Sequence, residues 1–255
     1  MYSWRKRVIP VLLLRGEGLV KTKRFKNPAY IGDAINAVRI FNEKEVDELA
    51  LIDITPLRER PEPNYDFLKD ITSECFSPLS YGGKVTNIQQ IRKILSIGVE
   101  KVIINSAAIE NPTFLREACN IFGSSTIVGS IDVKKDFWGK QRVYTSYGSK
   151  NTGKSPLEII SLFEQCGVGE ILLNSIDRDG MQNGYDLDLI KSLSSSVNIP
   201  LISCGGAMDT DDFVKAFQHG ASAVAAGSKF VFNGKHNAVL ITYISPEENE
   251  KLLKL

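Results

Sequence analysis

The sequence predicts a (β/α)8 barrel, or TIM barrel, formed by a single domain over residues 1–255. Eight short apolar runs alternate with segments of helical periodicity. Each run is apolar at consecutive positions, as expected for parallel strands that are covered on both faces. Eight β–α units in a chain of this length fit the barrel, whereas a doubly wound sheet would need a reversal of strand order that the sequence does not show.

The expected strands follow one another at regular intervals, with amphipathic segments between them. The strands are expected at 8–14, 48–54, 78–83, 101–107, 126–133, 170–177, 200–206 and 223–227. The helices include 88–96, 113–121, 156–166, 186–194 and 211–219. Residues 58–63 are expected to form an exposed loop. Residues 246–255 could form a short amphipathic helix, but a solvated tail is the preferred interpretation.

The two halves of the chain resemble each other, which predicts a duplicated half-barrel. Matching features recur at a shift of 122 to 124 residues and no linker divides the chain. The matching pairs are Gly82-Gly83 with Gly205-Gly206, Gly98 with Gly220, Ser106 with Ser228, and Asp53 with Asp177.

Composition argues against several classes of protein. With 31 basic and 30 acidic residues, the chain shows no overall attraction to nucleic acid or to an anionic membrane. We see no secretion signal and no apolar run long enough to span a bilayer. The four cysteines are far apart and form no CxxC pair, which is typical of a reduced cytoplasmic protein. With only two histidines, no metal site is expected, and no organic cofactor is implied.

The C-terminal ends of barrel strands form the active face, and here they carry acids and glycines. Glycine-rich turns and helix starts can bind anions through backbone N–H groups. The two related sets predict two phosphate-binding cradles on opposite sides of the barrel mouth, although ordinary tight turns would also explain the glycines. The expected substrate-binding residues are Lys21, Asp53, Gly82, Gly83, Asn105, Ser106, Asp179, Gly180, Gly205, Gly206, Gly227 and Ser228.

Asp132 is the candidate general acid or base, because it ends the fifth expected strand. A duplicated half-barrel would place a second acid on the facing strand, where an acid and a base could work as a pair. The first strand carries Leu13 at that position, and a leucine side chain cannot transfer a proton.

Charges also precede the strands at the opposite end of the barrel. Arg7, Glu48, Lys101 and Glu170 each lie at the start of an apolar run. Two positive and two negative groups could pair into a ring across the barrel axis, since buried charge is tolerated when it is paired. Ordinary surface charge is the favoured explanation for any one of them, whereas four residues with cancelling charge favour the ring.

Several motifs are similar to those of the cyclase subunit of imidazole glycerol phosphate synthase, the HisF family, from Arg7 to about Phe232. They include GLVK at 18–21, VDELALIDIT at 46–55, EKVIINSAAIENP at 100–112, SIDVK at 130–134, KNTG at 150–153, GEILLNSIDRDG at 169–180 and GYD at 184–186. The resemblance implies a lyase–cyclase barrel that receives ammonia from a HisH-like glutaminase at its N-terminal face. It also implies that Arg7, Glu48, Lys101 and Glu170 form a gate.

The resemblance further implies two catalytic aspartates at the mouth, of which Asp132 matches the second and Leu13 replaces the first. Lys84 replaces a third glycine after Gly83, and Ser149 stands where the family has a lysine. The segments 38–49 and 228–243 resemble a divergent branch associated with surface polysaccharides. In that branch the barrel supplies ammonia to a third protein, which converts an N-acetyl sugar to an acetamidino sugar.

Three functions therefore remain in view. The first is ammonia conduction for acetamidino-sugar synthesis. The second is the cyclase reaction of histidine biosynthesis, with Asp132 acting alone or aided by Asp177 or Asp179. The third is a binding module for a phosphorylated metabolite, for which the two cradles would suffice.

Overall fold

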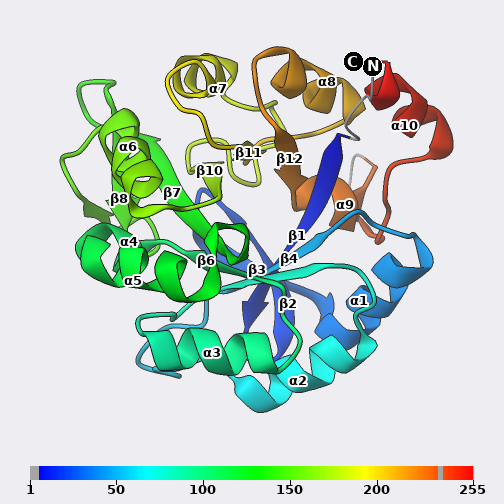
Figure 1. Cartoon of the computed structure of the whole chain (residues 1–255). Helices are drawn as coiled ribbons and strands as arrows, with labels where there is room; N and C mark the ends of the chain where they lie inside the picture. The colour runs from blue at the N-terminus through cyan, green and yellow to red at the C-terminus, as the bar shows by residue number, and fades with distance from the viewer. Residues whose placement is uncertain (1–5, 235–237, 255) are drawn as a thin grey trace.

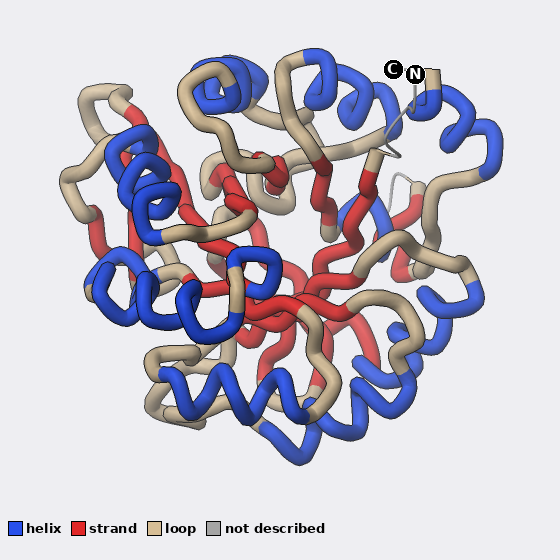
Figure 2. The backbone as a smooth tube through the Cα atoms, in the orientation of Figure 1, coloured by secondary structure: helices blue, strands red, loops and turns tan. Residues whose placement is uncertain are grey.

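The computed structural model describes residues 6–234 and 238–254, and its architecture is the predicted (β/α)8 barrel. Eight parallel strands close into a ring in the order β1-β4-β5-β6-β7-β10-β11-β12, with β12 paired to β1. Helices surround this ring (Figure 1), and the strands occupy the centre of the backbone tube (Figure 2). Among the described residues, no helix is both long and apolar enough to cross a bilayer.

The elements follow each other as strand and helix, with short additions at the mouth. The strands are β1 Arg7–Arg15, β2 Gly18–Lys23, β3 Lys26–Asp33, β4 Leu49–Asp53, β5 Leu79–Gly82, β6 Lys101–Ile104, β7 Ile127–Lys135, β8 Gln141–Thr145, β9 Lys150–Asn151, β10 Glu170–Ser175, β11 Leu201–Cys204, β12 Ala223–Ala226, β13 Phe232–Asn233 and β14 Ala238–Val239. The helices are α1 Ala34–Glu43, α2 Tyr65–Glu74, α3 Ile88–Ser96, α4 Ser106–Glu110, α5 Pro112–Phe122, α6 Pro156–Cys166, α7 Leu187–Ser194, α8 Thr210–Gln218, α9 Ser228–Val231 and α10 Pro246–Leu253, with a short 3₁₀ turn at Ser124–Thr126.

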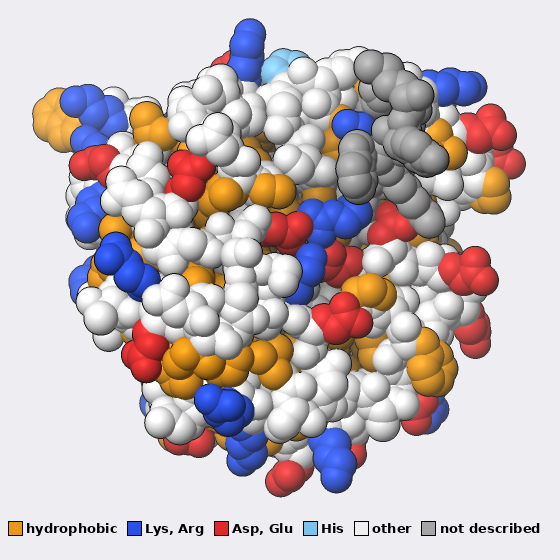
Figure 3. Space-filling model, viewed as in Figure 1, with side chains coloured by type: hydrophobic (Ala, Val, Ile, Leu, Met, Phe, Trp, Pro, Cys, Tyr) orange, Lys and Arg blue, Asp and Glu red, His pale blue; other side chains and the backbone are white. Residues whose placement is uncertain are grey.

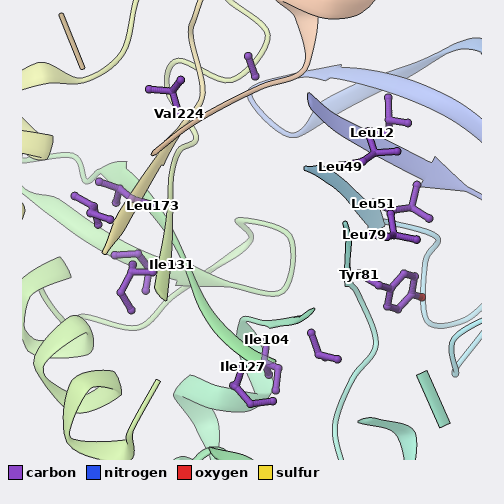
Figure 4. Packing of buried hydrophobic residues seen from close by; sticks show 14 of the residues in the cluster. Leu12, Leu49, Leu51, Leu79, Tyr81, Ile104, Ile127, Ile131, Leu173 and Val224 are labelled. Atoms are coloured by element: carbon purple, nitrogen blue, oxygen red, sulfur yellow. The ribbon is translucent and has the colours of Figure 1, made fainter. Parts of the chain in front are cut away.

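The continuous apolar runs are explained by two cores, one on each side of the barrel wall. In β1, Val8, Leu12 and Leu14 pack outward against the helices, whereas Ile9 and Val11 pack inside the barrel. Figure 4 shows members of the outer core on successive strands. Both faces of a strand are therefore apolar, as parallel strands covered by helices require.

The predicted duplication is also visible in the backbone. Gly83 and Gly206 follow β5 and β11 with φ of 118° and 109°, and Gly98 and Gly220 precede β6 and β12 with φ of 114° and 99°. These are conformations that glycine adopts at little cost. The same backbone geometry thus recurs half a chain apart.

Several predicted boundaries differ from the structure. The prediction that residues 105–107 end a strand is wrong, because Asn105 precedes α4 and Ser106 begins that helix. Two antiparallel additions beyond the mouth were not predicted, β2–β3 after β1 and β8–β9 after β7. These strands contain polar and charged residues, so they lack the continuous apolar runs by which the strands of the ring were predicted.

The predicted solvated tail is wrong, because residues 246–253 form α10. Pro246 occupies the first turn, and Ser245 and Glu248 form a reciprocal capping box. Glu248 also pairs with Lys229 at 3.4 Å, and Leu252 is buried to 1% exposure. The helix lies against α8 (Figure 1). This acidic and lysine-rich segment is held against the barrel by one buried leucine, its N-terminal cap and the Glu248–Lys229 ion pair.

Replacing Leu252 by alanine should therefore destabilise the protein by about 2–4 kcal/mol, the usual cost of truncating a buried leucine. The matched control is Leu253→Ala, because Leu253 is 49% exposed, and its effect should stay within about 0.5 kcal/mol. Urea denaturation followed by circular dichroism measures both values. Equal effects at the two positions would contradict the packing of α10.

Candidate functional site

The four charged residues at the strand starts meet in one ion-paired ring across the N-terminal end of the barrel. Arg7 contacts Glu48 at 2.9 Å and Glu170 at 2.5 Å. Lys101 contacts the same two carboxylates, at 3.2 and 3.0 Å. Charges of opposite sign alternate around the ring, so each carboxylate is held by two cations. Figure 3 shows acidic and basic side chains lying together near the middle of one face.

The ring is shielded from water, and its burial shapes its electrostatics. Side-chain exposure is 28% for Arg7, 6% for Glu48, 19% for Lys101 and 15% for Glu170. Burial opposes the charge of Arg7, but attraction to Glu170 and then to Glu48 outweighs it and raises the arginine pKa. Removing one partner of a buried ion pair leaves an uncompensated charge and strongly destabilises the folded protein. The stability of each ring residue therefore depends on its partners in the ring.

A small cavity lies directly inside the ring, within the barrel. Its lining is Ile9, Glu48, Ala50, Ser80, Ile103, Val128, Leu172, Ile202 and Ala225. It has about 10 Å³ open to the centre of a water-sized molecule, close to the minimum for holding one. Ser80 donates to Glu48 at 2.7 Å, so polar groups lie at the ring end of an otherwise apolar space.

Leu13 lies further along the axis, toward the mouth. It points into the barrel and packs with Ile52 and Cys204 against the inner apolar core. Its strand neighbours in the sheet are Val20 and Ile52. The surroundings of Leu13 are therefore apolar, and Asp53, on the adjacent strand, pairs with Lys84 instead.

Asp132 lies on β7 at the mouth, and its raised pKa suits proton transfer. Burial, and then the negative charge of Asp179, raise its pKa to about 7. Asn105 donates from Nδ2 both to Asp132 at 3.2 Å and to the Ser130 carbonyl at 3.0 Å, which fixes the carboxyl group on its strand. A group that titrates near neutral pH can donate or accept a proton under physiological conditions.

Lys21 approaches the second-half cradle although it belongs to the first half. A Cβ atom placed on Gly227 would lie 1.9 Å from Lys21 Nζ, so the ammonium group rests against that glycine. Burial lowers the pKa of Lys21, against the attraction of Asp179 and of Cys204. Asp179 in turn accepts from Thr22 Oγ1 at 2.8 Å, which holds β2 at the mouth. An anion near Gly227 would therefore meet a cation with little competing solvent.

Lys84 directly follows the two glycines of the expected first-half cradle. Its side chain is fully buried and lies 2.5 Å from Asp53, which is also buried and accepts from Tyr81 Oη at 3.4 Å. Burial lowers the pKa of Lys84, although Asp53 favours its charged form. Lys84 also has φ of 60°, a left-handed conformation that glycine adopts more easily. The expected first-half cradle is thus followed by a buried cation that is already paired with Asp53.

Most remaining predicted residues surround the mouth, but several are engaged in packing. Ser106 Oγ donates to Asn105 and accepts from the Ser146 backbone, and so connects β6 to the β8–β9 turn. Close backbone approach accounts for several glycines, because a Cβ on Gly180 would lie 2.1 Å from the Thr22 carbonyl oxygen. The same holds for Gly82, Gly83, Gly205 and Gly206, whose added Cβ atoms would lie 3.0 Å or less from neighbouring atoms. Ser228 begins α9 directly after Gly227.

Two residues of the site were missed by sequence reasoning. Ser80 joins the charged ring, and its position beside Ala50 in the β4–β5 register could have indicated it. Cys204 was not singled out, and it lies among the buried groups of the mouth, where burial, and then the charge of Asp179, raise its pKa to about 12. In the part of the chain that the structure describes, no cluster of three histidine, cysteine or acidic side chains is arranged to hold a metal ion.

The raised pKa of Asp132 predicts a pH-dependent stability. Because burial raises the folded-state pKa of Asp132 to about 7, above the ordinary aspartate value of about 3.9, the folded protein loses stability as pH rises from about 4 to about 7. Asp132→Asn should remove this loss and stabilise the protein at pH 8 by ~2 kcal/mol, after allowance for partial exposure. The difference should disappear at pH 4. Urea titrations at the two pH values measure it, and an equal effect at both would contradict the raised pKa.

Comparison with known proteins places the chain among proteins of related sequence. The family model described as histidine biosynthesis protein matches residues 7–237. Two relatives named "Putative imidazole glycerol phosphate synthase subunit" are hisF2 of Pseudomonas aeruginosa, 51% identical over 96% of this chain and 98% of the relative, and HisF of Leptospira interrogans, 46% identical over 97% and 98%. The imidazole glycerol phosphate synthase subunit HisF of Helicobacter hepaticus is 39% identical over 95% and 96%. The chain therefore belongs to the HisF-type imidazole glycerol phosphate synthase subunit family.

Proposed function

We propose that this chain conducts ammonia from a HisH-like glutaminase, docked at the ring end of the barrel, to its mouth. A third protein uses this ammonia there to convert an N-acetyl sugar to an acetamidino sugar in surface-glycan synthesis. The observation that carries the proposal is a complete charged ring below a small internal cavity, combined with Leu13 in place of one mouth acid.

The lower half of the barrel supports transport of a small neutral molecule. Ammonia has about the size of water, and the cavity inside the ring is close to the size needed for one such molecule. Most of its lining is apolar, which favours neutral ammonia over the ammonium ion. The paired side chains of Arg7, Glu48, Lys101 and Glu170 close the end of this path, so passage requires at least one of them to move.

The upper half supports a reduced chemical role for the mouth. Asp132 remains, but its facing position is Leu13, and Lys84 pairs with Asp53 in the first-half cradle. Replacing the carbonyl oxygen of an acetamido group by nitrogen requires that oxygen to be activated as a leaving group. We assign this activation to the third protein and the supply of the nitrogen to this chain.

A second candidate function is the cyclase reaction named by the relatives, imidazole glycerol phosphate synthesis. Asp132 favours it, because its pKa of about 7 suits a single residue that both donates and accepts protons. Lys21 against Gly227 would also suit one phosphate group of such a substrate. Simple binding of a phosphorylated metabolite, the third interpretation, would use the same residues without the charged ring.

The first test separates the two reactions at Leu13. The wild-type chain with its glutaminase should form no imidazole glycerol phosphate and should not restore growth to a histidine auxotroph that lacks its own cyclase subunit. Leu13→Asp should raise imidazole product at least ~10-fold above background, because losing one member of an acid/base pair commonly costs about 10²–10⁴-fold. Leu13→Asn is the control, since it adds a polar group that cannot exchange a proton. Robust product from the wild type would refute the proposal.

The second test addresses the charged ring through Lys101→Met, which keeps the length of the side chain and removes its charge. Glu48 and Glu170 would each lose a partner. We expect glutamine-dependent amidine formation to fall roughly 10-fold, while formation from added ammonium chloride and glutamine hydrolysis change less than about twofold.

Lys69→Met is the matched control, because Lys69 is exposed on α2 away from the ring. It should leave both nitrogen sources equally effective. If Lys101→Met reduced the glutamine and ammonium reactions to the same extent, the ring would not control ammonia transfer and the proposal would be wrong.

A further inference from the structure

The turn between β7 and β8 presents two aromatic side chains to solvent. Phe137 is 94% exposed and Trp138 is 80% exposed, and their rings stack edge to face with centroids 5.5 Å apart. Large aromatic residues are usually buried or take part in recognition, and tryptophan is prominent among the residues that dominate binding energy at protein interfaces. The mouth chemistry described above uses neither ring.

Hydrogen bonds fix the backbone of the turn that carries the two rings. Asp136 accepts from the backbone N–H groups of Trp138 and Lys140, both at 2.9 Å, and from Arg142 at 3.3 Å. The backbone closes with Asp136 N donating to the Lys140 carbonyl at 2.8 Å. Asp136 is only 14% exposed, so its charge serves the turn itself. A preorganised recognition element loses less conformational entropy on binding.

The hairpin rises directly from the mouth. Asp132 lies on the same strand and pairs with Tyr144 of β8, four residues before Asp136. At about 3.3 Å per residue, the turn lies roughly 15 Å beyond that acid. Asp177 accepts from the Lys135 backbone at 2.9 Å, and its own carbonyl accepts from Arg24 Nε at 3.2 Å. The hairpin is thereby joined to the β2–β3 turn at the edge of the mouth.

Both of these projections are basic, in a chain of net charge +1. Lys23, Arg24 and Lys26 contribute three positive charges without an acid between them, and residues 134–142 carry four basic groups and one acid. Lys135 and Lys140 are exposed and make no ion pair with any described residue. A partner that receives the aromatic rings would therefore need an apolar groove with an acidic rim.

Other exposed apolar side chains surround the mouth on separate loops. Leu57 follows β4, Met181 follows β10 and Met208 follows β11, with exposures of 57%, 37% and 56%. A flat bilayer would contact chiefly the projecting turn. A protein groove can receive the turn and also cover these lower residues, which would enclose the exit.

We propose that the β7–β8 hairpin, residues 133–143, together with the basic β2–β3 turn, residues 23–26, is the docking surface for the enzyme that consumes the ammonia. That enzyme presents an apolar groove with an acidic rim, into which Phe137 and Trp138 insert. The assignment of the partner rests on the proposed function, whereas the surface itself rests on exposure, rigidity and charge. Docking at this position would deliver ammonia without release into bulk solvent.

The experiment places a photo-crosslinking benzoylphenylalanine at position 138 of the full chain, expressed with its glutaminase in the native host. The control position is 76, because Phe76 is 84% exposed but precedes β5 at the opposite end of the barrel. Mass spectrometry identifies the adduct. The captured protein is then purified and titrated against the wild-type complex, Trp138→Ala and Phe76→Ala, with circular dichroism checking that each variant folds.

We expect position 138 to capture one protein other than the glutaminase, and position 76, at the glutaminase end of the barrel, not to capture that protein. The dissociation constant between the captured protein and the complex should rise about 30-fold or more with Trp138→Ala and less than about twofold with Phe76→Ala. It should also rise at least ~10-fold between 0.1 and 0.5 M NaCl. The captured protein should also form an amidine from an N-acetyl sugar when ammonium chloride is supplied directly, together with a nucleoside triphosphate that activates the amide oxygen and carries it away as phosphate or nucleotide. That reaction does not depend on the barrel, so it identifies the partner even if ammonia conduction fails.

Three results would overturn the inference. One is the absence of any protein adduct at position 138. Another is binding that Trp138→Ala leaves unchanged. The third is Trp138-dependent binding to vesicles of one part phosphatidylglycerol and three parts phosphatidylcholine, or to a 40-base-pair DNA duplex, in place of the protein. Retained docking in the Lys101→Met variant, together with lost glutamine-dependent transfer, would separate this surface from the charged ring.

Discussion

The structure depends on four charges that can remain inside a barrel only because they satisfy one another. Arg7 and Lys101 each contact Glu48 and Glu170, so removing any one member leaves a poorly solvated charge. Apolar residues of similar volume would fill this end of the barrel at less electrostatic cost. Under the proposed function, the ring seals this end of the barrel and opens for ammonia, because ion pairs can exchange partners and a packed apolar plug cannot.

The contrast between the two ends of the barrel follows from this arrangement. At the ring end every charge has a partner of opposite sign, and a cavity continues inward. At the mouth Asp132 lies near Asp179, and like charge together with burial holds its pKa near 7. Leu13 supplies no opposing group, and Lys84 already pairs with Asp53 beside the first-half glycines. The charges of the ring are therefore paired, whereas those at the mouth are arranged asymmetrically.

This asymmetry gives the exposed hairpin a meaning. A barrel that completes its own reaction needs only a mouth that closes over substrate, but a barrel that passes ammonia onward needs a receiver. Phe137 and Trp138 are held outward by a turn that Asp136 organises, at a substantial cost in exposed apolar surface. Such a surface is expected where a partner covers it.

Local sequence was sufficient for the barrel and for the candidate ring, because apolar runs buried on both faces have few other arrangements and because strand starts lie at one end of a parallel barrel. It was also sufficient to show that Leu13 cannot move a proton. Only the tertiary structure showed that Lys21 crosses to Gly227, that Lys84 pairs with Asp53 and that residues 246–253 pack against α8. Those outcomes depend on side chains brought together from distant segments, and the spacing of residues along the chain carries no information about such contacts.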